Sequence, residues 1–449
     1  MNNNDTICAL ATAPGGALGI IRISGPQTLE ILSRIFTKDL TQTPPNTIHY
    51  GHIRNGSEMI DECLVSIFRA PHSYTGEDAA EISCHGSRYI LNKVLELLVQ
   101  NGCRMAGPGE YTLRAYLNGK MDLSQAEAVA DLIASSNKAT HRLAMSQLRG
   151  HFSSQLAQLR EQLLKLTSLL ELELDFSDHE DLEFADRKEL NELAKTIDNH
   201  ISKLAHSFET GQTLKQGIPV AIIGKTNVGK STLLNRLLKD DRAIVSDVHG
   251  TTRDTIEDTI DLQGITFRFI DTAGIRQTTD EVEKIGISRT FSAIQKARIV
   301  LWVIDGEPSN EEINRITEQT ENKKVIIVRN KSDLSSNNHF TIVNFPLIAI
   351  SAKHGTNIDA LESAIHDAAD IPTFTDADVI VTNARHYDAL TRAHECIQCV
   401  LDGMEQQLSG DLLAEDLRQA LDTLSEITGG QITPNEVLGN IFINFCVGK

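Results

Sequence analysis

The sequence predicts a multidomain protein in which a mixed α/β domain is followed by a helical domain, and an α/β domain is inserted into the helical one. Alternating strand and helix patterns run from about residue 216 to 372, as in a parallel doubly wound sheet. Helical periodicity flanks this segment on both sides. Strand patterns and turn sequences fill residues 1–118.

The first domain is expected to span residues 1–118. Pro-Gly-Gly, Ser-Gly-Pro and Asn-Gly sequences divide it into short elements. One helix is predicted over 88–99, and strands are predicted over 6–11, 19–23, 63–68 and 80–83.

The helical domain is expected in two parts, 119–215 and 373–449. Ser124 and Glu127 have the spacing of a capping box before an alanine-rich run. Apolar residues at three- and four-residue steps predict the helices, which lie over about 148–170, 190–208, 383–408 and 411–427, and from Glu436 to the end. The economical arrangement is one helical bundle built from both flanks of residues 216–372.

Within the inserted segment, Gly224-Lys-Thr-Asn-Val-Gly-Lys-Ser231 fits the phosphate-loop pattern between a strand and a helix. Its glycines let backbone N–H groups face phosphates at a helix N-terminus. Lys230 would reach the β- and γ-phosphates, and the Ser231 hydroxyl would ligate Mg²⁺. The nucleotide contacts expected here are Asn227, Val228, Gly229, Lys230, Ser231 and Thr232.

A base reader follows in Asn330-Lys-Ser-Asp333. The Asp333 carboxylate can accept hydrogen bonds from the N1–H and N2 amine of guanine, which adenine does not offer. Ser351-Ala-Lys353 fits a backbone contact to guanine O6. Both strings in this order predict binding of GTP and GDP and hydrolysis of GTP. The expected contacts at this end are Asn330, Lys331, Ser332, Asp333, Ser351, Ala352 and Lys353.

Two more strings lie between these elements. Thr252, in Gly250-Thr-Thr-Arg-Asp254, is the candidate that senses Mg²⁺ and the γ-phosphate. Asp271, in Asp271-Thr-Ala-Gly274, can hold Mg²⁺ through water. The expected nucleotide contacts in these two strings are Gly250, Thr251, Thr252, Asp271, Thr272, Ala273 and Gly274.

Many GTPases place a water-orienting glutamine where this chain has Ile275. Either the domain only binds nucleotide, or another residue orients the water, and the candidates are Arg276, Glu281, Glu283 and Arg289. A replacement for the positive charge of an arginine finger, which contributes ~10³–10⁵ in rate, is also needed. Asn227 could hold a monovalent cation there, although turn chemistry explains this residue equally well.

The chain has 42 basic and 61 acidic residues, a net charge of −19, which excludes a general attraction to nucleic acid. Any RNA contact must therefore be local or shared with a basic partner. Seven cysteines are too few for a disulfide scaffold, and no leader or membrane-length apolar run is apparent. We expect a soluble, cytoplasmic protein with no membrane contact.

The chain resembles the MnmE (TrmE) family of tRNA-modification GTPases over essentially its whole length. The strings that carry the resemblance are Gly19-Ile-Ile-Arg-Ile-Ser-Gly25, Ser73-Tyr-Thr-Gly-Glu-Asp78, His85-Gly86, Pro108-Gly-Glu-Tyr111, Leu117-Asn-Gly-Lys-Met-Asp-Leu-Ser-Gln-Ala-Glu127, Gly250-Thr-Thr-Arg-Asp254, Asp271-Thr-Ala-Gly-Ile-Arg276 and Phe445-Cys-Val-Gly-Lys449. The resemblance implies a tetrahydrofolate-binding N-terminal domain that forms a homodimer, a discontinuous helical domain and an inserted Ras-like P-loop G domain.

The resemblance also implies an activity. Members of the family are potassium-activated GTPases that act with the FAD-containing protein MnmG in a heterotetramer. Together they add an aminomethyl or carboxymethylaminomethyl group to carbon 5 of the wobble uridine of certain tRNAs. A folate such as 5-formyltetrahydrofolate supplies the one-carbon unit, and GTP hydrolysis drives the conformational cycle.

Site residues follow from the same resemblance, position by position. The resemblance adds Ser246, Asp247, Val248 and His249 to the expected nucleotide contacts. Magnesium would lie on Ser231 and Thr252, and potassium on Asn227, Ser246, Val248 and Thr251. Glu283 would orient the attacking water, through a bridging water. Folate would lie on Arg22, Glu81, Lys120 and Lys449. The alternatives are a ribosome-assembly GTPase and a nucleotide-dependent scaffold that has lost catalysis at Ile275.

Overall fold

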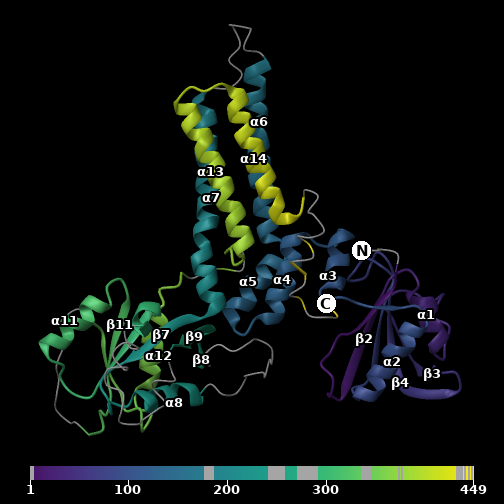
Figure 1. The fold of residues 1–449 in the computed structure, drawn as a ribbon, viewed down its shortest axis with the longest axis horizontal. Coiled ribbons are helices and arrows are strands. Elements are labelled where there is room, and N and C mark those ends of the chain that lie inside the picture. Colours follow the sequence, from purple (N-terminus) through teal and green to yellow (C-terminus); the bar gives the residue numbers. More distant parts are fainter. Residues whose placement is uncertain are drawn as a thin grey trace. The chain divides into compact units, whose positions relative to one another are not determined.

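The computed structural model describes residues 5–175, 187–240, 258–270, 292–334, 345–372, 375, 378–430, 438, 441–442, 445 and 448. The chain divides into two compact units (Figure 1). One contains Met1–Ala134, Ala144–Lys203 and Arg385–Lys449, and the other contains Ser135–Leu143 and Leu204–Ala384.

The first unit begins with a six-stranded sheet in the order β3-β4-β5-β2-β1-β6. The strands are β1 (Ile7–Leu10), β2 (Leu18–Ser24), β3 (Thr47–Asn55), β4 (Glu58–Phe68), β5 (Ala79–His85) and β6 (Arg104–Met105). Neighbouring strands are antiparallel, except that β6 runs parallel to β1. The mixed α/β prediction is confirmed, and β3 is a strand that the sequence patterns did not reveal.

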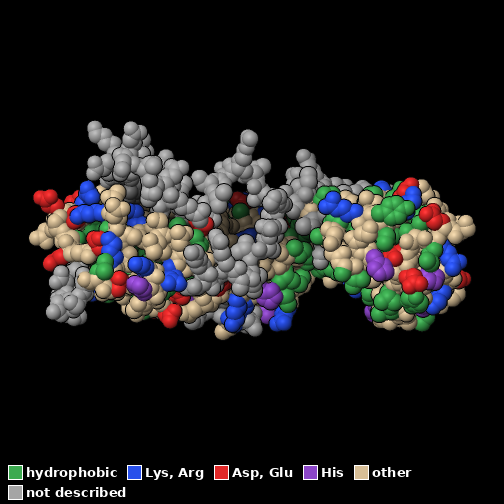
Figure 2. Space-filling view, turned by 90° about the horizontal axis from the view of Figure 1, so that it is seen from below, with side chains coloured by type: hydrophobic (Ala, Val, Ile, Leu, Met, Phe, Trp, Pro, Cys, Tyr) green, Lys and Arg blue, Asp and Glu red, His purple; other side chains and the backbone are tan. Residues whose placement is uncertain are grey.

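The two faces of this sheet differ. Helices α1 (Thr28–Ile35) and α2 (Arg88–Gln100) pack on one face, where inward side chains such as Ile82 form the core. On the other face, helix α3 (Glu110–Leu117) places Tyr111 against buried residues of β1. Several large apolar side chains of the N-terminal region remain exposed, and Figure 2 shows hydrophobic side chains at its surface, on the right. They include Leu18, Ile48, Tyr50 and Leu64.

Long helices from both flanks of the second unit form the rest of the first one, which takes in α5 from Ala144 and α7 up to Lys203. They are α4 (Leu123–Ala134), α5 (Lys138–Leu148), α6 (His151–Asp175), α7 (Arg187–Gln216), α13 (Ala384–Glu405) and α14 (Gly410–Thr428). Helix α14 packs along α6, and Asp198 of α7 pairs with His394 of α13 at 2.7 Å. The predicted discontinuous helical bundle is therefore confirmed.

Two details of the predicted helices are wrong. Helix α4 is capped by Asp122, whose Oδ1 accepts the N–H of Gln125 at 2.9 Å, so Ser124 lies inside the helix. Aspartate and serine are equally good N-cap residues, and here the cap is Asp122, which directly precedes the buried Leu123. The last helix does not reach the end, because Phe445 is not helical and Gly448 has a positive φ of 93°.

The second unit contains a six-stranded sheet in the order β12-β11-β10-β7-β9-β8. Its strands are β7 (Ile218–Ile223), β8 (Asp258–Leu262), β9 (Ile265–Phe269), β10 (Ile299–Ile304), β11 (Lys324–Arg329) and β12 (Leu347–Ala349). All pairs are parallel except β8 with β9. Every residue of β10 is buried, as expected for a strand covered on both faces. The doubly wound prediction is confirmed.

Helices α8 (Lys230–Asp240), α11 (Asn310–Gln319) and α12 (Ile358–Ala368) border this sheet, and a short helical segment at 292–296 packs against it through Ala293 and Ile294. The start of α5 also belongs to this unit. There, Ala139 donates its N–H to the carbonyl of Gly264, in the turn between β8 and β9, at 2.9 Å. None of the helices in the described ranges is long and apolar enough to span a bilayer.

Candidate functional site

The phosphate loop joins β7 to α8 and turns at two glycines with positive φ, Gly224 at 143° and Gly229 at 98°. A Cβ at Gly224 would lie 2.2 Å from the carbonyl oxygen of Val303. A Cβ at Gly229 would lie 2.2 Å from the side-chain nitrogen of Asn330. Both positions therefore require glycine, for conformation and for space.

Lys230, the first residue of α8, turns back over this loop. Its ammonium group donates to the carbonyl oxygens of Gly224 at 2.7 Å and Lys225 at 2.6 Å. Burial lowers the pKa of Lys230. Ser231 and Thr232 follow in the first turn of the helix. The loop thus gathers a cation and a helix N-terminus, the combination that binds phosphate.

Asn227 is exposed at the outer turn of the loop, with a φ of 64°. Asparagine tolerates this left-handed conformation better than most residues. Turn chemistry therefore accounts for the residue, and its oxygen is also accessible to a cation. The two interpretations of Asn227 both stand.

The base-reading end is built from the carboxyl ends of β11 and β12. Ser351, which is 1% exposed, donates its hydroxyl to the Asp333 carboxylate at 2.6 Å. That hydrogen bond lowers the pKa of Asp333. Lys331 pairs with Asp305 at 2.8 Å. The carboxylate is thus held ionised and oriented, as a reader of guanine N–H groups must be.

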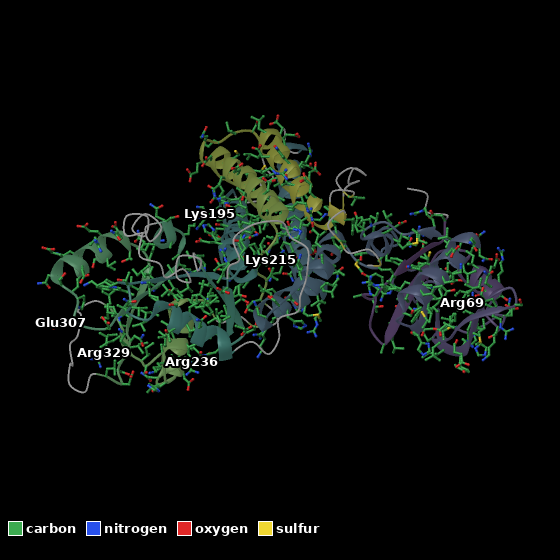
Figure 3. All side chains as sticks on the ribbon, turned by 60° about the horizontal axis from the view of Figure 1, so that its bottom comes forward. Arg69, Lys195, Lys215, Arg236, Glu307 and Arg329 are labelled. Atoms are coloured by element: carbon green, nitrogen blue, oxygen red, sulfur yellow. The ribbon has the colours of Figure 1, made fainter. Side chains whose placement is uncertain are left out.

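The structure brings the phosphate loop and the base reader to the same edge of the sheet. The side chain of Asn330 donates to the carbonyl of Val228 in the loop at 2.8 Å and accepts the N–H of Ala352 at 3.0 Å. Arg236 of α8, labelled in Figure 3, donates to the carbonyl of Lys353 at 3.3 Å. Ligands of open α/β sheets bind at this carboxyl edge.

Part of the predicted nucleotide site lies outside the described residues. This holds for Ser246, Asp247, Val248, His249, Gly250, Thr251, Thr252, Asp271, Thr272, Ala273 and Gly274. Glu283 and its alternatives Arg276, Glu281 and Arg289 also lie there, as does Lys449. These assignments remain predictions.

Three of the predicted folate residues lie in the described part of the first unit. Arg22 of β2 and Glu81 of β5 are opposite each other in the sheet and form an ion pair at 2.8 Å. Arg22 also donates to the carbonyl of Gly448 at 3.2 Å, which places Gly448 beside this pair. Lys120 donates its ammonium group to the carbonyl of Pro71 at 2.9 Å.

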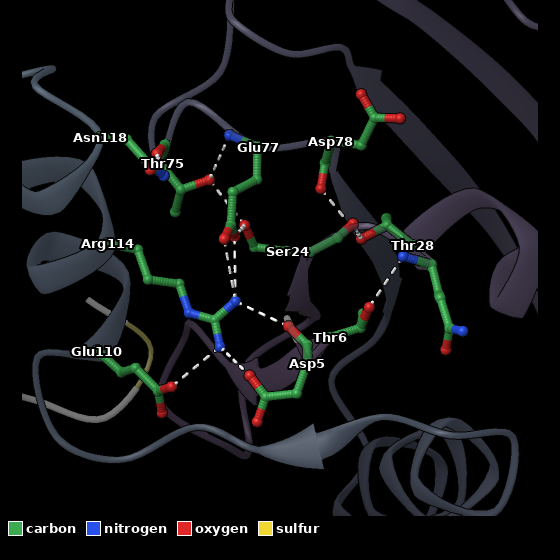
Figure 4. Close-up of polar contacts among 12 residues, drawn as sticks. Asp5, Thr6, Ser24, Thr28, Thr75, Glu77, Asp78, Glu110, Arg114 and Asn118 are labelled. Carbon is green, nitrogen blue, oxygen red and sulfur yellow. Dashed lines mark hydrogen bonds and ion pairs between the residues drawn. The ribbon is translucent and has the colours of Figure 1, made fainter. Parts of the chain in front are cut away.

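A buried charge network supports this region, and sequence reasoning missed it (Figure 4). Arg114, which is 3% exposed, donates to Glu77 at 3.1 Å, to Glu110 at 3.1 Å and to the carboxylate of Asp5 at 2.6 Å. Burial raises the pKa of Glu110, but Arg104 and Arg114 outweigh it and hold the pKa below its usual range. The four-residue spacing of Glu110 and Arg114 in a helix was the available signal.

The chain is similar to known proteins along its whole length. A family profile described as "GTP-binding protein TrmE N-terminus" matches residues 6–120, and one described as "MnmE helical domain" matches residues 123–446. The "tRNA modification GTPase MnmE" of Bacteroides thetaiotaomicron is 56% identical over 466 residues, covering 100% of both chains. The protein of the same name from Flavobacterium johnsoniae is 50% identical over 468 residues, again covering 100% of both.

Proposed function

This chain belongs to the MnmE (TrmE) family of tRNA modification GTPases, so it hydrolyses GTP and acts in tRNA modification. From that premise we propose the details of its chemistry. Its GTP hydrolysis is activated by potassium. With the FAD-containing protein MnmG, it adds an aminomethyl or carboxymethylaminomethyl group to carbon 5 of the wobble uridine of certain tRNAs. A folate supplies the one-carbon unit, and hydrolysis drives the conformational cycle.

The observation that carries the nucleotide-binding part is the pair of hydrogen bonds made by Asn330. It joins the phosphate loop to the segment that follows β12, so phosphate and base groups of one nucleotide are addressed together. In this proposal Lys230 binds the β- and γ-phosphates and Asp333 reads guanine. Magnesium is held by Ser231 and Thr252, as in other phosphate-loop enzymes.

Potassium takes the place of an arginine finger in this proposal. Its ligands are Asn227, Ser246, Val248 and Thr251, and when bound it supplies positive charge beside the transferred phosphoryl group. The accessible Asn227 side chain and the hydrocarbon side chain of Ile275 support this assignment. Glu283 orients the attacking water through a bridging water.

The proposed folate site is formed by Arg22, Glu81, Lys120 and Lys449. It is supported by the ion pair of Arg22 with Glu81 and by the contact of Arg22 with Gly448, the neighbour of Lys449. Cationic groups suit the glutamate carboxylates of folate, and a carboxylate suits the N–H groups of its pteridine ring.

The proposed domains are 1–118 for folate binding and dimerisation, 119–215 and 373–449 for the helical domain, and 216–372 for the G domain. Homodimer formation through the first domain is supported by its exposed apolar side chains, among them Ile48 and Tyr50. The complex with MnmG is proposed to supply most of the tRNA contact, since the net charge of −19 disfavours nucleic acid.

The test is steady-state phosphate release by the purified full-length protein in KCl and in NaCl at equal ionic strength. We expect turnover with GTP that is faster in KCl, and an Asn227→Ala variant that binds Mg²⁺ and GTP but loses the stimulation. Equal rates in both salts would overturn potassium activation. Titration with 5-formyltetrahydrofolate tests the folate site separately.

A further inference from the structure

Tyr74 is a partly exposed aromatic residue whose hydroxyl is fixed in the interior. The residue is 42% exposed. Its hydroxyl is hydrogen-bonded at 2.9 Å to the hydroxyl of Thr112 in α3, and Thr112 is fully buried. When the hydroxyl of a tyrosine is held at a buried position, the part of the side chain that remains exposed is the ring. Tyr74 therefore presents ring surface to solvent in a fixed position.

The loop that carries Tyr74, between β4 and β5, is held in place directly after this residue. Thr75, the next residue, is 1% exposed, and its side chain and carbonyl are bonded to Ser24 and Asn118 (Figure 4). Glu77 is bonded to Arg114 and to Ser24. These contacts leave the backbone beside Tyr74 little freedom, so the exposed ring is not explained by a loose loop.

Neighbouring residues of α3 bring this ring to the proposed folate site. Tyr111 donates its hydroxyl to the carbonyl of Arg22 at 2.9 Å, and the adjacent Thr112 holds Tyr74. Burial raises the pKa of Tyr74, and the Thr112 hydrogen bond and then the charge of Arg22 oppose that rise, as expected for close neighbours. Arg22 is in turn paired with Glu81.

Lys120 reaches the same loop from the other end of α3. Its ammonium group is bonded to Pro71, and its side-chain carbons lie near Gly76, where a Cβ would be 3.4 Å from them. Tyr74 lies in sequence between these two contacts. The loop that carries the ring is thus contacted by Lys120, and the ring itself lies within the electrostatic influence of Arg22.

We infer that Tyr74 is a folate-binding residue whose ring stacks on the pteridine. This inference rests on the proposed folate function and extends it to a residue that binds through its π-face. In a tetrahydropteridine the pyrimidinone ring is flat and the other ring is reduced, so a flat contact is needed over the pyrimidinone ring. Glu81 and Lys120 offer no flat surface, and the planar guanidinium of Arg22 is already engaged by Glu81 and Gly448. Stacking of a heterocycle on an aromatic side chain is a strong and sequence-tolerant contact in nucleic-acid binding.

The experiment is calorimetric titration of the full-length protein with 5-formyltetrahydrofolate. Tyr74→Leu removes the ring but keeps an apolar side chain, and it should weaken binding by about five- to a hundred-fold. Tyr74→Phe keeps the ring and loses only the bond to Thr112, so its affinity should fall by no more than about threefold. Tyr89→Leu is the matched control, because Tyr89 is 65% exposed on α2, and its affinity should not change.

The outcomes separate the inference from the function it rests on. Wild-type affinity in Tyr74→Leu, together with loss of binding in Arg22→Ala, would refute stacking while keeping the folate site. An absence of binding by the wild-type chain would instead overturn the proposed folate function, and with it the role of Tyr74. Thermal unfolding followed by circular dichroism shows for each variant whether the unit that carries Tyr74 has folded, since the nucleotide site lies in the other unit and GTP affinity reports only on that one.

Discussion

The side-chain amide of Asn330 donates a hydrogen bond of 2.8 Å to the carbonyl oxygen of Val228. Asn330 is 5% exposed, and its own carbonyl oxygen accepts the N–H of Ala352. One side chain therefore completes the hydrogen bonding of the phosphate loop and of the segment that follows β12. The geometry of each depends on the other.

Replacing Asn330 with alanine should weaken GDP and GTP binding at least tenfold. The change leaves a carbonyl and an N–H group unpaired at a buried position, and each costs about 1–3 kcal/mol. Titration with a fluorescent GDP analogue measures the effect. Asn310→Ala is the control, because Asn310 lies exposed at the start of α11. Unchanged affinity in Asn330→Ala would show that the two segments hold their positions independently.

The Asp333→Asn change should shift the base preference from guanine toward xanthine. An amide at this position offers a donor where guanine needs an acceptor, and xanthine carries an oxygen at that place. Ser351 already donates to Asp333 and can equally bond to the amide oxygen, so the fold should be kept. Competition between GDP and XDP is the measurement. An unchanged preference for GDP would remove Asp333 from base reading.

Motifs and buried strands were the predictable part of this protein. The doubly wound sheet followed from apolar runs such as that of β10, and the phosphate loop and base reader followed from residues whose chemistry is local. Strand β3 was missed because it lies at the sheet edge, where His49, His52 and Arg54 interrupt the apolar pattern. Edge strands carry a weaker signal because one side has no strand partner.

Long-range polar partnerships could not be predicted. Glu127 was assigned to a capping box from its spacing to Ser124, whereas the fold pairs it with residues more than 250 positions away. Arg114 likewise binds Glu77 and Asp5 across the N-terminal domain. Such contacts depend on which helices and strands pack together in the fold, and the spacing of residues in the sequence does not predict this packing.

The buried carboxylate of Glu127 should make the helical bundle sensitive to acid. It accepts hydrogen bonds from Arg385 at 2.9 and 3.0 Å and lies 2.6 Å from Nε2 of His386. Burial raises the pKa of Glu127, but His386 and then Arg385 outweigh it and lower the pKa from 4.5 to about 2. A depressed pKa in the folded state stabilises the protein above about pH 4.5, and this contribution disappears as the pH falls toward 2.

Glu127→Gln should therefore destabilise the bundle by about 3 kcal/mol at pH 7 and by less at pH 3. Urea unfolding followed by circular dichroism at the two pH values measures the difference. Glu426→Gln is the control, because Glu426 pairs with Arg392 at the surface and the pair contributes at most about 1 kcal/mol. A pH-independent effect of Glu127→Gln would mean that packing, and not charge, accounts for the loss.

Gly211 of α7 should not tolerate alanine, although helix propensity alone favours the change. A Cβ at Gly211 would lie 2.1 Å from the carbonyl oxygen of Val381, in the segment that follows the sheet of the second unit. That segment is bonded to α7 on both sides of the contact, by Val381 to Ser207 at 3.0 Å and by Gln212 to Thr382 at 3.0 Å. It has little room to move away.

Gly211→Ala should therefore lower the free energy of unfolding by about 1–3 kcal/mol, the usual effect of overpacking. In a helix with free space at this position, the same change would raise it by about 1 kcal/mol. Thermal unfolding of the full-length protein gives the sign. Thr213→Ala, two positions along the same helix, is the control, and it should leave the melting temperature unchanged or raise it slightly. A higher melting temperature for Gly211→Ala would show that the 378–384 segment is free to leave α7, because only then does propensity decide the outcome.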